Sequence, residues 1–267
     1  MLYIWAVLNS NVMKPYLLEE TNWHTVKEME YQVALLPWGA TEAHNYHLPY
    51  GSDTCMATHV ARRSAALAWE RGVKALVLPQ IAYGVNSGQM DIPFCMHMNP
   101  STQQRILEDI VTVLIRHKVH KLVIVNGHGG NSFQNAIREL ELRFPGMFIC
   151  MVNWWRVCPV KEYFDNPGDH ADEMETSAMM AIRPELVLPL EYAGSGKEHR
   201  FTIKGLREKW AWISRRWIYT TDDTGVGDPS LSTPEKGKRF LEDCIDEVAA
   251  FLEDFSKIEK TEDLYER

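Results

Sequence analysis

The chain has 267 residues, of which 45% are hydrophobic, enough for one large α/β domain or two small ones. Its formal net charge of −8 argues against non-specific nucleic-acid binding, because such binding needs a basic face. No apolar run approaches the roughly 18 residues that a transmembrane helix needs, so we expect no membrane association.

The N-terminal stretch has a short apolar run but neither a basic region nor a small-residue cleavage pattern, so we expect no signal peptide. Met13 offers a second start. We predict that residues 1–12 are poorly ordered or mis-assigned and that residues 13–267 form a single domain. The cysteines are scattered without a CxxC pair, which indicates a reducing compartment and a cytoplasmic protein: Cys55, Cys95, Cys150, Cys158 and Cys244.

Apolar runs and helical patterns alternate along the chain. We expect strands at 32–39, 75–84, 121–129 and 147–155. We expect helices at 53–72, at 99–120 with Ser101 or Thr102 as N-cap, at 131–146, after the acidic cluster of 168–182, and at 233–259.

Three of the strand candidates are apolar at nearly every position, which is typical of a parallel sheet covered on both faces. The alternation therefore predicts one α/β domain with a mostly parallel sheet and helices on both faces. Open parallel sheets bind ligands beyond the carboxyl ends of their strands. Motifs that follow the first and third strands should therefore meet at one edge.

The first motif, "GATEAHNYHLPYGSD", places Glu42, His44 and Asp53 just after a strand. Carboxylate and imidazole ligands suit zinc, manganese or iron. An alternative interpretation is a polar loop in which Asp53 caps the following helix.

The second motif, "VNGHGGN", places His128 after the third strand in a turn that its glycines allow. The alternative is a phosphate-binding loop of a nucleotide-binding protein. The spacing is not G-x-G-x-x-G, however, and the next strand lacks the acid expected of a ribose site, which disfavours that alternative.

The third cluster, "GDHADEMETS", brings His170, Asp172, Glu173 and Glu175 within seven residues. An acidic helix N-terminus would explain the carboxylates, because the helix dipole favours negative charge there. The histidine beside them is placed to act as an acid or base near neutral pH. Three separated clusters of acids and histidines favour a metal site over coincidence.

In these stretches, together with "TGVGDPSLSTPEKG", the sequence resembles the creatininase (creatinine amidohydrolase) family, over roughly residues 33 to 240. The resemblance implies a compact α/β fold, one or two divalent ions and hydrolysis of non-peptide C–N amide bonds. It also implies a homo-oligomer, commonly a hexamer.

Matched position by position, the family's metal ligands fall on Glu42, His44, Asp53 and His128, with Asp53 bridging the ions in two-metal members. Glu175 falls on the acid of the E-T-S motif and His170 on the catalytic histidine. The resemblance also implies substrate contacts at positions that fall on Trp154 or Trp155, Gly129 and Gly130.

The sequence departs from the family pattern at Asn45, Tyr46 and Asp172, and in two further places that affect the second ion and the substrate. Creatinine hydrolases carry a glutamate ligand where this chain has Gly130, so Glu175 or Glu173 would have to supply the carboxylate of a second ion. The histidine usual after the second strand is absent, and Gln89 stands in that segment with His97 farther on. Creatinine is therefore not the expected substrate.

The resulting hypothesis is a metal-dependent amidohydrolase in which a metal-bound hydroxide attacks the carbonyl of a small cyclic or formamide-type amide. His170 then protonates the leaving nitrogen, and Glu175 binds or orients a ligand. His47 is expected to anchor the loop. The alternative is a non-catalytic metal-binding sensor or scaffold with the same fold.

Overall fold

A computed structural model describes residues 14–266, so the predictions for residues 1–12 and for a start at Met13 lie outside the described residues. Four parallel strands form one sheet in the order β2-β1-β3-β4. Their bounds are Val33–Trp38 for β1, Ala75–Val77 for β2, Lys121–Asn126 for β3 and Phe148–Asn153 for β4. The predicted α/β fold with a parallel sheet is confirmed.

Helices connect the strands and follow the sheet. They are α2 (Trp23–Val26), α3 (Ser52–Glu70), α4 (Pro100–Arg116), α5 (Gln134–Arg143), α6 (Glu173–Ile182), α7 (Lys204–Arg207), α8 (Trp217–Thr220) and α9 (Pro234–Ser256). Short 3₁₀ turns are η2 (Leu18–Glu20), η3 (Ser87–Gln89), η4 (Trp154–Arg156), η5 (Val160–Glu162), η6 (Pro184–Leu186), η7 (Leu190–Tyr192) and η8 (Thr261–Leu264). Within residues 14–266, no helix is both long and apolar enough to cross a bilayer.

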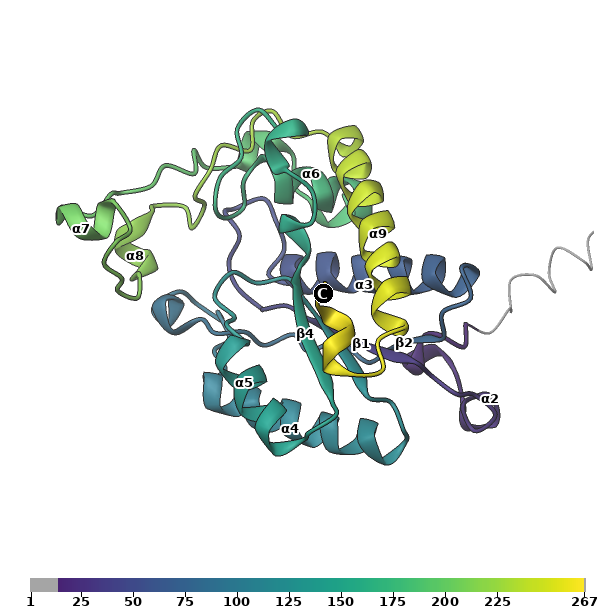
Figure 1. Cartoon of the computed structure of the whole chain (residues 1–267). Helices are drawn as coiled ribbons and strands as arrows, with labels where there is room; N and C mark the ends of the chain where they lie inside the picture. The colour runs from purple at the N-terminus through teal and green to yellow at the C-terminus, as the bar shows by residue number, and fades with distance from the viewer. Residues whose placement is uncertain (1–13, 267) are drawn as a thin grey trace, which may run out of the picture.

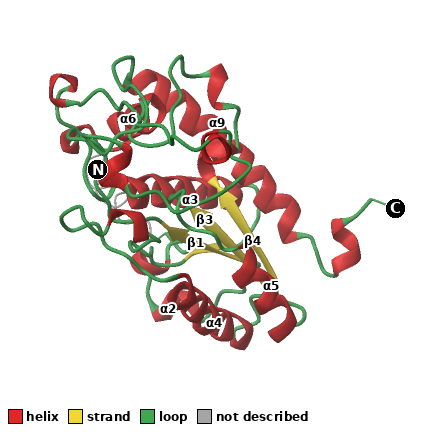
Figure 2. Cartoon of the chain, turned by 90° about the vertical axis from the view of Figure 1, so that its left-hand side faces the viewer, coloured by secondary structure: helices red, strands yellow, loops and turns green. Residues whose placement is uncertain are grey.

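The sheet lies between two helical layers. Helices α3, α6 and α9 cover one face, and α4 and α5 cover the other (Figures 1 and 2). Alternate residues of β1 serve the two layers: Val33 and Leu35 face α3 and α9, whereas Ala34 and Leu36 face α4 and α5. Burial on both faces explains why the strands read as continuous apolar runs.

Two local predictions were wrong. The second strand ends at Val77 instead of continuing to residue 84, because Pro79 has no N–H for a sheet ladder. The N-cap of α4 lies two or three residues earlier than predicted: Asn99 is the N-cap and Pro100 takes the first helical position, where its fixed φ is well suited. Neither Ser101 nor Thr102 therefore caps α4.

Candidate metal centre

The candidate site lies where β1 and β3 end side by side. The last residues of these strands, Trp38 and Asn126, are register partners. The order β2-β1-β3-β4 makes the boundary between β1 and β3 the point where successive connections run in opposite directions. Ligands of open α/β sheets bind at such a switch point. Glu42 and His44 follow β1, and His128 follows β3, so both motifs reach this edge.

Glu42, Asp53 and His128 form one half of the site. His128 Nδ1 lies 2.9 Å from Glu42 Oε1 and 3.0 Å from Asp53 Oδ2. The other ring nitrogen, Nε2, donates to the carbonyl oxygen of Val85 at 3.2 Å. This hydrogen bond fixes the ring and leaves Nδ1 facing the carboxylates, as is usual for a metal-binding histidine.

His44, Asp53 and Glu175 form the other half. His44 Nε2 lies 3.0 Å from Asp53 Oδ1 and 3.9 Å from Glu175 Oε2. His44 Nδ1 donates to the backbone oxygen of Glu42 at 3.1 Å. Asp53 therefore belongs to both halves, with one carboxylate oxygen toward each histidine.

Asp53 is not the cap of α3, because Gly51 occupies the N-cap position and Asp53 lies inside the first turn. Its carboxylate is buried, and Oδ2 makes no hydrogen bond of good geometry among the described residues, its near neighbour being the ring nitrogen Nδ1 of His128 at 3.0 Å. An unsatisfied buried carboxylate oxygen is costly unless a cation completes it. The capping interpretation of Asp53 therefore fails, and the metal interpretation gains support.

Helix α6 resolves which acid reaches the cluster. Asp172 caps it, accepting the Glu175 N–H at 3.0 Å. Glu175 Oε2 accepts from the Ala171 N–H at 2.6 Å and faces His44. Glu173 instead points away from the cluster and pairs with Lys236 Nζ at 2.5 Å. Of the two acids that the sequence left open, only Glu175 lies beside the predicted ligands.

His170 borders the same cluster. Its Nε2 donates to the Ala43 carbonyl oxygen at 2.8 Å, and its Nδ1 lies 3.7 Å from Glu42 Oε1. The ring lies 4.1 Å from that of His44. A bridge to Val226 holds its backbone, with the Val226 N–H donating to the His170 carbonyl at 2.8 Å. His170 therefore presents one unprotonated nitrogen toward the cavity.

The cluster fits divalent ions. Three overlapping groups each offer ligand atoms within 4.8 Å of one another: Glu42 with Asp53 and His128, His44 with Asp53 and Glu175, and Glu42 with His44 and His170. The first two groups share Asp53, whose two oxygens face different histidines. Nitrogen and carboxylate donors in groups of three are the ligands that zinc and manganese take in proteins.

Charge pairing dominates the electrostatics of the site. Burial alone would lower the pKa of His44, but the carboxylates of Asp53, Glu175 and Glu42 raise it to about 10. Burial would likewise lower the pKa of His128, but the carboxylates of Glu42 and Asp53 raise it well above its usual value. Burial raises the pKa of Glu175 to about 8. Burial and the neighbouring charge of His44 lower the pKa of His170 to about 3, so its imidazole is neutral at pH 7.

A cavity of about 900 Å³ opens over the cluster, and Gly129, Gly130 and Trp155 are among its lining residues. Its volume is that of a pocket for a small molecule. The structure does not bring Trp154 to this cavity: its ring is buried and packs 5.9 Å from that of Phe240. Substrate contact stays a prediction for Trp155 alone of the two tryptophans.

The loop at Gly130 leaves no space for a side chain. A Cβ there would overlap His128 Nε2 and the Val85 carbonyl oxygen, the two atoms that hydrogen-bond to each other. This chain therefore cannot place a carboxylate at residue 130 without moving Val85. Glu175 is the acid that the fold brings to the site instead, in the half that it forms with His44 and Asp53.

Two polar residues singled out in the sequence, Gln89 and His47, lie beside the cluster. Gln89 Nε2 donates to Glu42 Oε2, and the Cys95 thiol donates to Gln89 Oε1 at 3.1 Å. Gln89 is buried and so holds the second oxygen of Glu42 in place. His47 lies behind the cluster, with Nε2 2.9 Å from Thr176 Oγ1, and ties the first loop to α6.

Trp217 was not anticipated from the sequence. Its ring meets that of His170 edge-on at 4.7 Å. It is the last residue of the segment 197–217. This segment has seven Lys or Arg and only two acidic residues, although the whole chain is acidic. The excess of basic residues in this segment was the one feature of the sequence that set it apart from the rest of the acidic chain.

Comparison with known proteins identifies the family. The model of the creatininase family, described as creatinine amidohydrolase, matches residues 19–252. A mycofactocin precursor peptide peptidase of Mycobacterium ulcerans is 30% identical over 229 residues, covering 80% of this chain and 84% of that protein. A creatinine amidohydrolase of Pseudomonas putida is 29% identical over 209 residues, covering 65% and 74%.

Solved structures agree. A candidate creatinine amidohydrolase from Bacteroides fragilis NCTC 9343 superposes with a TM-score of 0.89 at 43% identity, covering 95% of this chain and 99% of that one. A creatininase of Zn–Zn type has a TM-score of 0.72 at 25% identity, covering 89% and 97%. The chain is thus a hydrolase acting on C–N bonds, and it belongs to the creatininase family.

Proposed function

We propose that this protein is a metal-dependent amidohydrolase that cleaves the C–N bond of a small cyclic or formamide-type amide. The observation that carries the proposal is Asp53, whose buried carboxylate faces His44 with one oxygen and His128 with the other. Relatives are named as a creatinine amidohydrolase and as a deformylase of a formylamino pyrimidine monophosphate, which supports amides of this kind. Gly130 in place of a ligand glutamate argues against creatinine itself.

The ligand set supports one or two ions of zinc, manganese or iron. Glu42, Asp53 and His128 would hold one ion, and His44, Asp53 and Glu175 a second. Bound divalent ions lower the pKa of water and polarise a carbonyl oxygen. The hydrogen bonds from His128 to Val85 and from His44 to Glu42 orient the two rings before an ion arrives.

His170 would move the proton. Because Nε2 donates to the Ala43 carbonyl, Nδ1 is the nitrogen that can accept a proton from the attacking water. Its low pKa leaves Nδ1 unprotonated at pH 7 and therefore free to accept a proton, and it makes the protonated form a strong acid. The same Nδ1 would then pass the proton to the leaving nitrogen. Trp155 would border the substrate from the cavity wall.

The decisive experiment measures metal per chain on protein purified without chelator, for the natural sequence and for Asp53→Asn. We expect one to two equivalents of zinc, manganese or iron, lost together with hydrolysis of lactams and formamides in the variant. Asp246→Asn is the matched control, because that carboxylate is exposed and pairs with Arg71. A folded protein that takes up no metal after reconstitution would refute the proposal and favour a non-catalytic scaffold.

The family resemblance further supports a homo-oligomer, a hexamer in its commonest form, and the cysteine pattern supports a cytoplasmic location. All five cysteines are free in the structure. Mass photometry at nanomolar concentration would measure the oligomeric state, and cell fractionation the location.

A further inference from the structure

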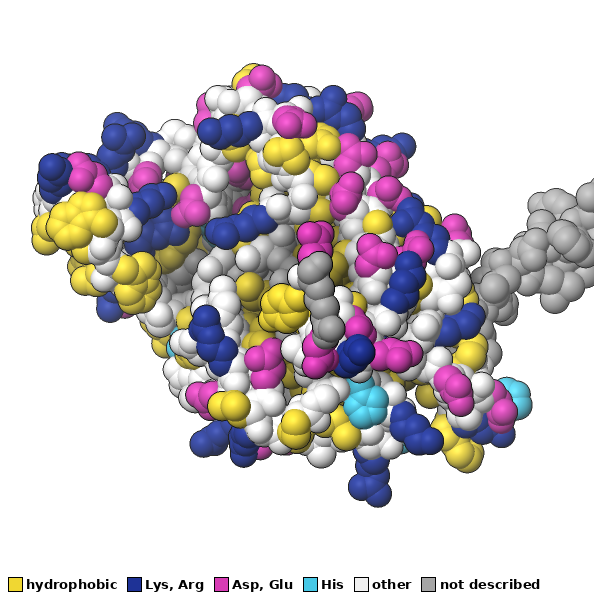
Figure 3. Space-filling model, in the orientation of Figure 1, with side chains coloured by type: hydrophobic (Ala, Val, Ile, Leu, Met, Phe, Trp, Pro, Cys, Tyr) yellow, Lys and Arg dark blue, Asp and Glu magenta, His cyan; other side chains and the backbone are white. Residues whose placement is uncertain are grey.

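A second cavity, of about 520 Å³, adjoins the metal-site cavity. It lies in the segment 197–217, which contains α7 and projects from the α/β body (Figures 1 and 3). The two cavities share four lining residues: Asp169, Trp212, Ile213 and Arg215. Asp169 immediately precedes His170 in the chain. A molecule bound at the metal site therefore has this second cavity as its neighbour.

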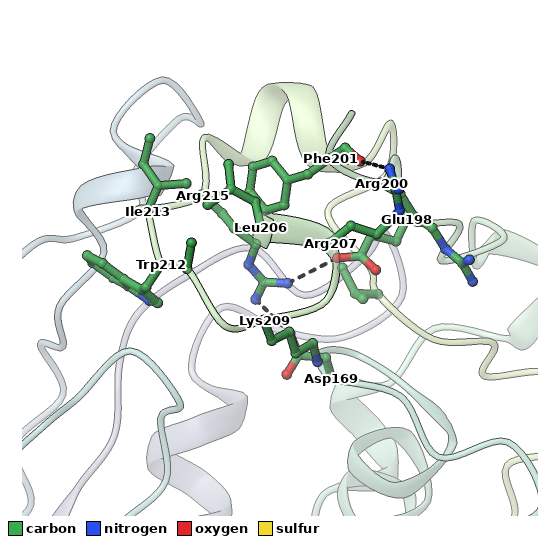
Figure 4. Close-up of a pocket in the computed structure, with 12 residues that line it drawn as sticks. Asp169, Glu198, Arg200, Phe201, Leu206, Arg207, Lys209, Trp212, Ile213 and Arg215 are labelled. Atoms are coloured by element: carbon green, nitrogen blue, oxygen red, sulfur yellow. Dashed lines mark hydrogen bonds and ion pairs between the residues drawn. The ribbon is translucent and has the colours of Figure 1, made fainter. Parts of the chain in front are cut away.

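Arg215 forms the wall between the cavities. Its guanidinium pairs with Asp169 at 2.6 Å and with Glu198 at 3.5 Å (Figure 4). It also lies 4.9 Å from the ring of Trp217, which contacts His170. Both acidic residues that line the second cavity thus pair with the same arginine, whose positive charge offsets one of their two negative charges.

The other charged residues of the cavity are basic. Arg200 and Lys209 have no carboxylate partner among residues 14–266, and Arg207 donates to the backbone oxygens of Phe201 and Thr202. Phe201, Leu206 and Ile213 supply an apolar lining beside them. An excess of positive charge in a concave, partly apolar site, within a chain of net charge −8, matches an organic anion.

The cavity wall is fastened to the rest of the fold. A Cβ at Gly88 would overlap the Arg215 carbonyl oxygen, so η3 and residue 215 meet backbone to backbone. Arg216 pairs with Asp91 at 2.6 Å, and the His199 N–H donates to the Thr220 carbonyl at 2.7 Å. Gly205 lies against the ring of Trp210, which holds α7 in the wall. The basic side chains therefore project from a wall whose backbone is held in place by these contacts.

We propose that the second cavity binds an anionic group, a carboxylate or a phosphate ester, on the far end of the amide substrate. The inference rests on the proposed function, because it places the scissile bond at the metal cluster. Arg200 and Lys209 are the specificity-determining residues. A substrate with an anionic tail would gain charge-assisted hydrogen bonds that an uncharged tail cannot make.

The test uses three matched series of formamides in which an alkyl chain of increasing length ends in a carboxylate, a phosphate ester or a primary carboxamide. At one chain length we expect the anionic member to have the lower KM. The double variant Arg200→Gln with Lys209→Gln should cut the KM advantage over the carboxamide about tenfold. The preferred series shows whether the group is a carboxylate or a phosphate ester.

Lys204→Gln is the matched control, because Lys204 belongs to α7, is exposed and does not line the cavity. It should leave the KM ratio unchanged. Equal KM values for anionic and uncharged tails at every length would overturn the inference while leaving the amidohydrolase proposal standing. An equal loss for both tails in the double variant would do the same.

If no formamide or lactam is hydrolysed, the proposed function is wrong. Anion binding to the metal-loaded protein then tests the second cavity independently of hydrolysis. Calorimetry would titrate inorganic phosphate and acetate into the natural protein, the double variant and Lys204→Gln. Anion binding that only the double variant loses supports the cavity as an anion site. Equal binding by all three proteins, or none, would overturn it.

Discussion

Gly129 and Gly130 are neighbours in the loop after β3, but only Gly130 is confined. A Cβ at Gly130 would overlap His128 and Val85, whereas one at Gly129 would meet nothing within 4 Å. The hydrogen bond between His128 and Val85 thus needs a glycine at 130. The absence of a side chain there is part of how His128 is oriented.

Gly130→Ala should therefore weaken the metal site. Relieving the overlap requires Val85 or the His128 ring to move, at a cost of about 1–3 kcal/mol in the free energy of unfolding. Loss of the orienting hydrogen bond should lower metal affinity roughly 10- to 100-fold. Urea unfolding and metal titration measure the two effects. Gly129→Ala is the control, and similar losses in both variants would show that the packing at 130 is not the cause.

His170→Ala should reduce turnover at least about a hundredfold while the metal content stays unchanged, because general acid–base catalysis contributes that much. Steady-state kinetics and metal analysis on the same sample make the comparison. His199→Ala is the control, since that imidazole is half-exposed and lies 3.5 Å from Asp222. Turnover that survives in the His170 variant would remove the residue from the mechanism. Loss of metal would make it a ligand instead.

At the scale of elements, the N-terminus of α6 links the stability of that helix to the position of the predicted metal ligand Glu175. Asp172 caps the helix through the Glu175 N–H and also accepts from the Gly168 N–H at 2.6 Å. Glu175 is thus held at both its backbone and, through Ala171, its carboxylate. A cap that touches the ligand residue should influence metal binding as well as folding.

Asp172→Ala should lower the free energy of unfolding by about 1 kcal/mol and also lower metal affinity, because Glu175 loses its backbone anchor. Thr233→Ala removes an equivalent cap from α9, where Thr233 Oγ1 accepts the Lys236 N–H at 3.2 Å. That variant should lose similar stability but keep its metal. Chemical unfolding and metal titration of both variants separate the two effects. Equal metal affinities would confine Asp172 to a capping role.

The periodicity of the sequence was sufficient for the sheet and its two helical layers, because buried parallel strands leave continuous apolar runs such as 122–125. It overestimated β2, since the apolar run extends past Pro79 although the ladder cannot. Strand ends also predicted that Glu42, His44 and His128 would meet. These inferences needed only local pattern and the rule for open sheets.

Where two similar residues are close in the sequence, local pattern could not predict which one reaches the site, because tertiary contacts decide it. Glu173 and Glu175 are two residues apart in one acidic cluster, and Lys236 on α9 pairs with the Glu173 carboxylate at a distance from the site. Trp154 and Trp155 are adjacent, and the packing of Phe240 decides which one is buried in the core. Each choice depends on a partner more than 60 residues away in the chain.

At the scale of the whole molecule, metal binding and folding should be linked through protons. The pKa of His44 rises from 6.5 to about 10 on folding, and that of Glu175 from 4.5 to about 8. A raised pKa in the folded state stabilises the protein fully below the unfolded value and no longer does so above the folded one. The metal-free protein should therefore lose stability as the pH rises, between 4.5 and about 8 through Glu175 and between 6.5 and about 10 through His44. His170 acts oppositely, since its lowered pKa removes stability as the pH falls from 6.5 toward about 3.

Divalent ions bind the deprotonated forms of these ligands, so metal affinity should increase over the same alkaline interval. Metal that binds only the folded state raises Tm, and the Tm difference between loaded and metal-depleted protein should widen from pH 6.5 to about 8. Calorimetry in two buffers of different ionisation enthalpy should show protons released at pH 7 from His44, His128 and Glu175, about three per chain when both halves of the site fill. A Tm difference independent of pH, with no proton release, would mean that the cluster is already deprotonated without metal. In that case, ion pairs of protonated His44 and His128 with the carboxylates would not be what stabilises the metal-free site.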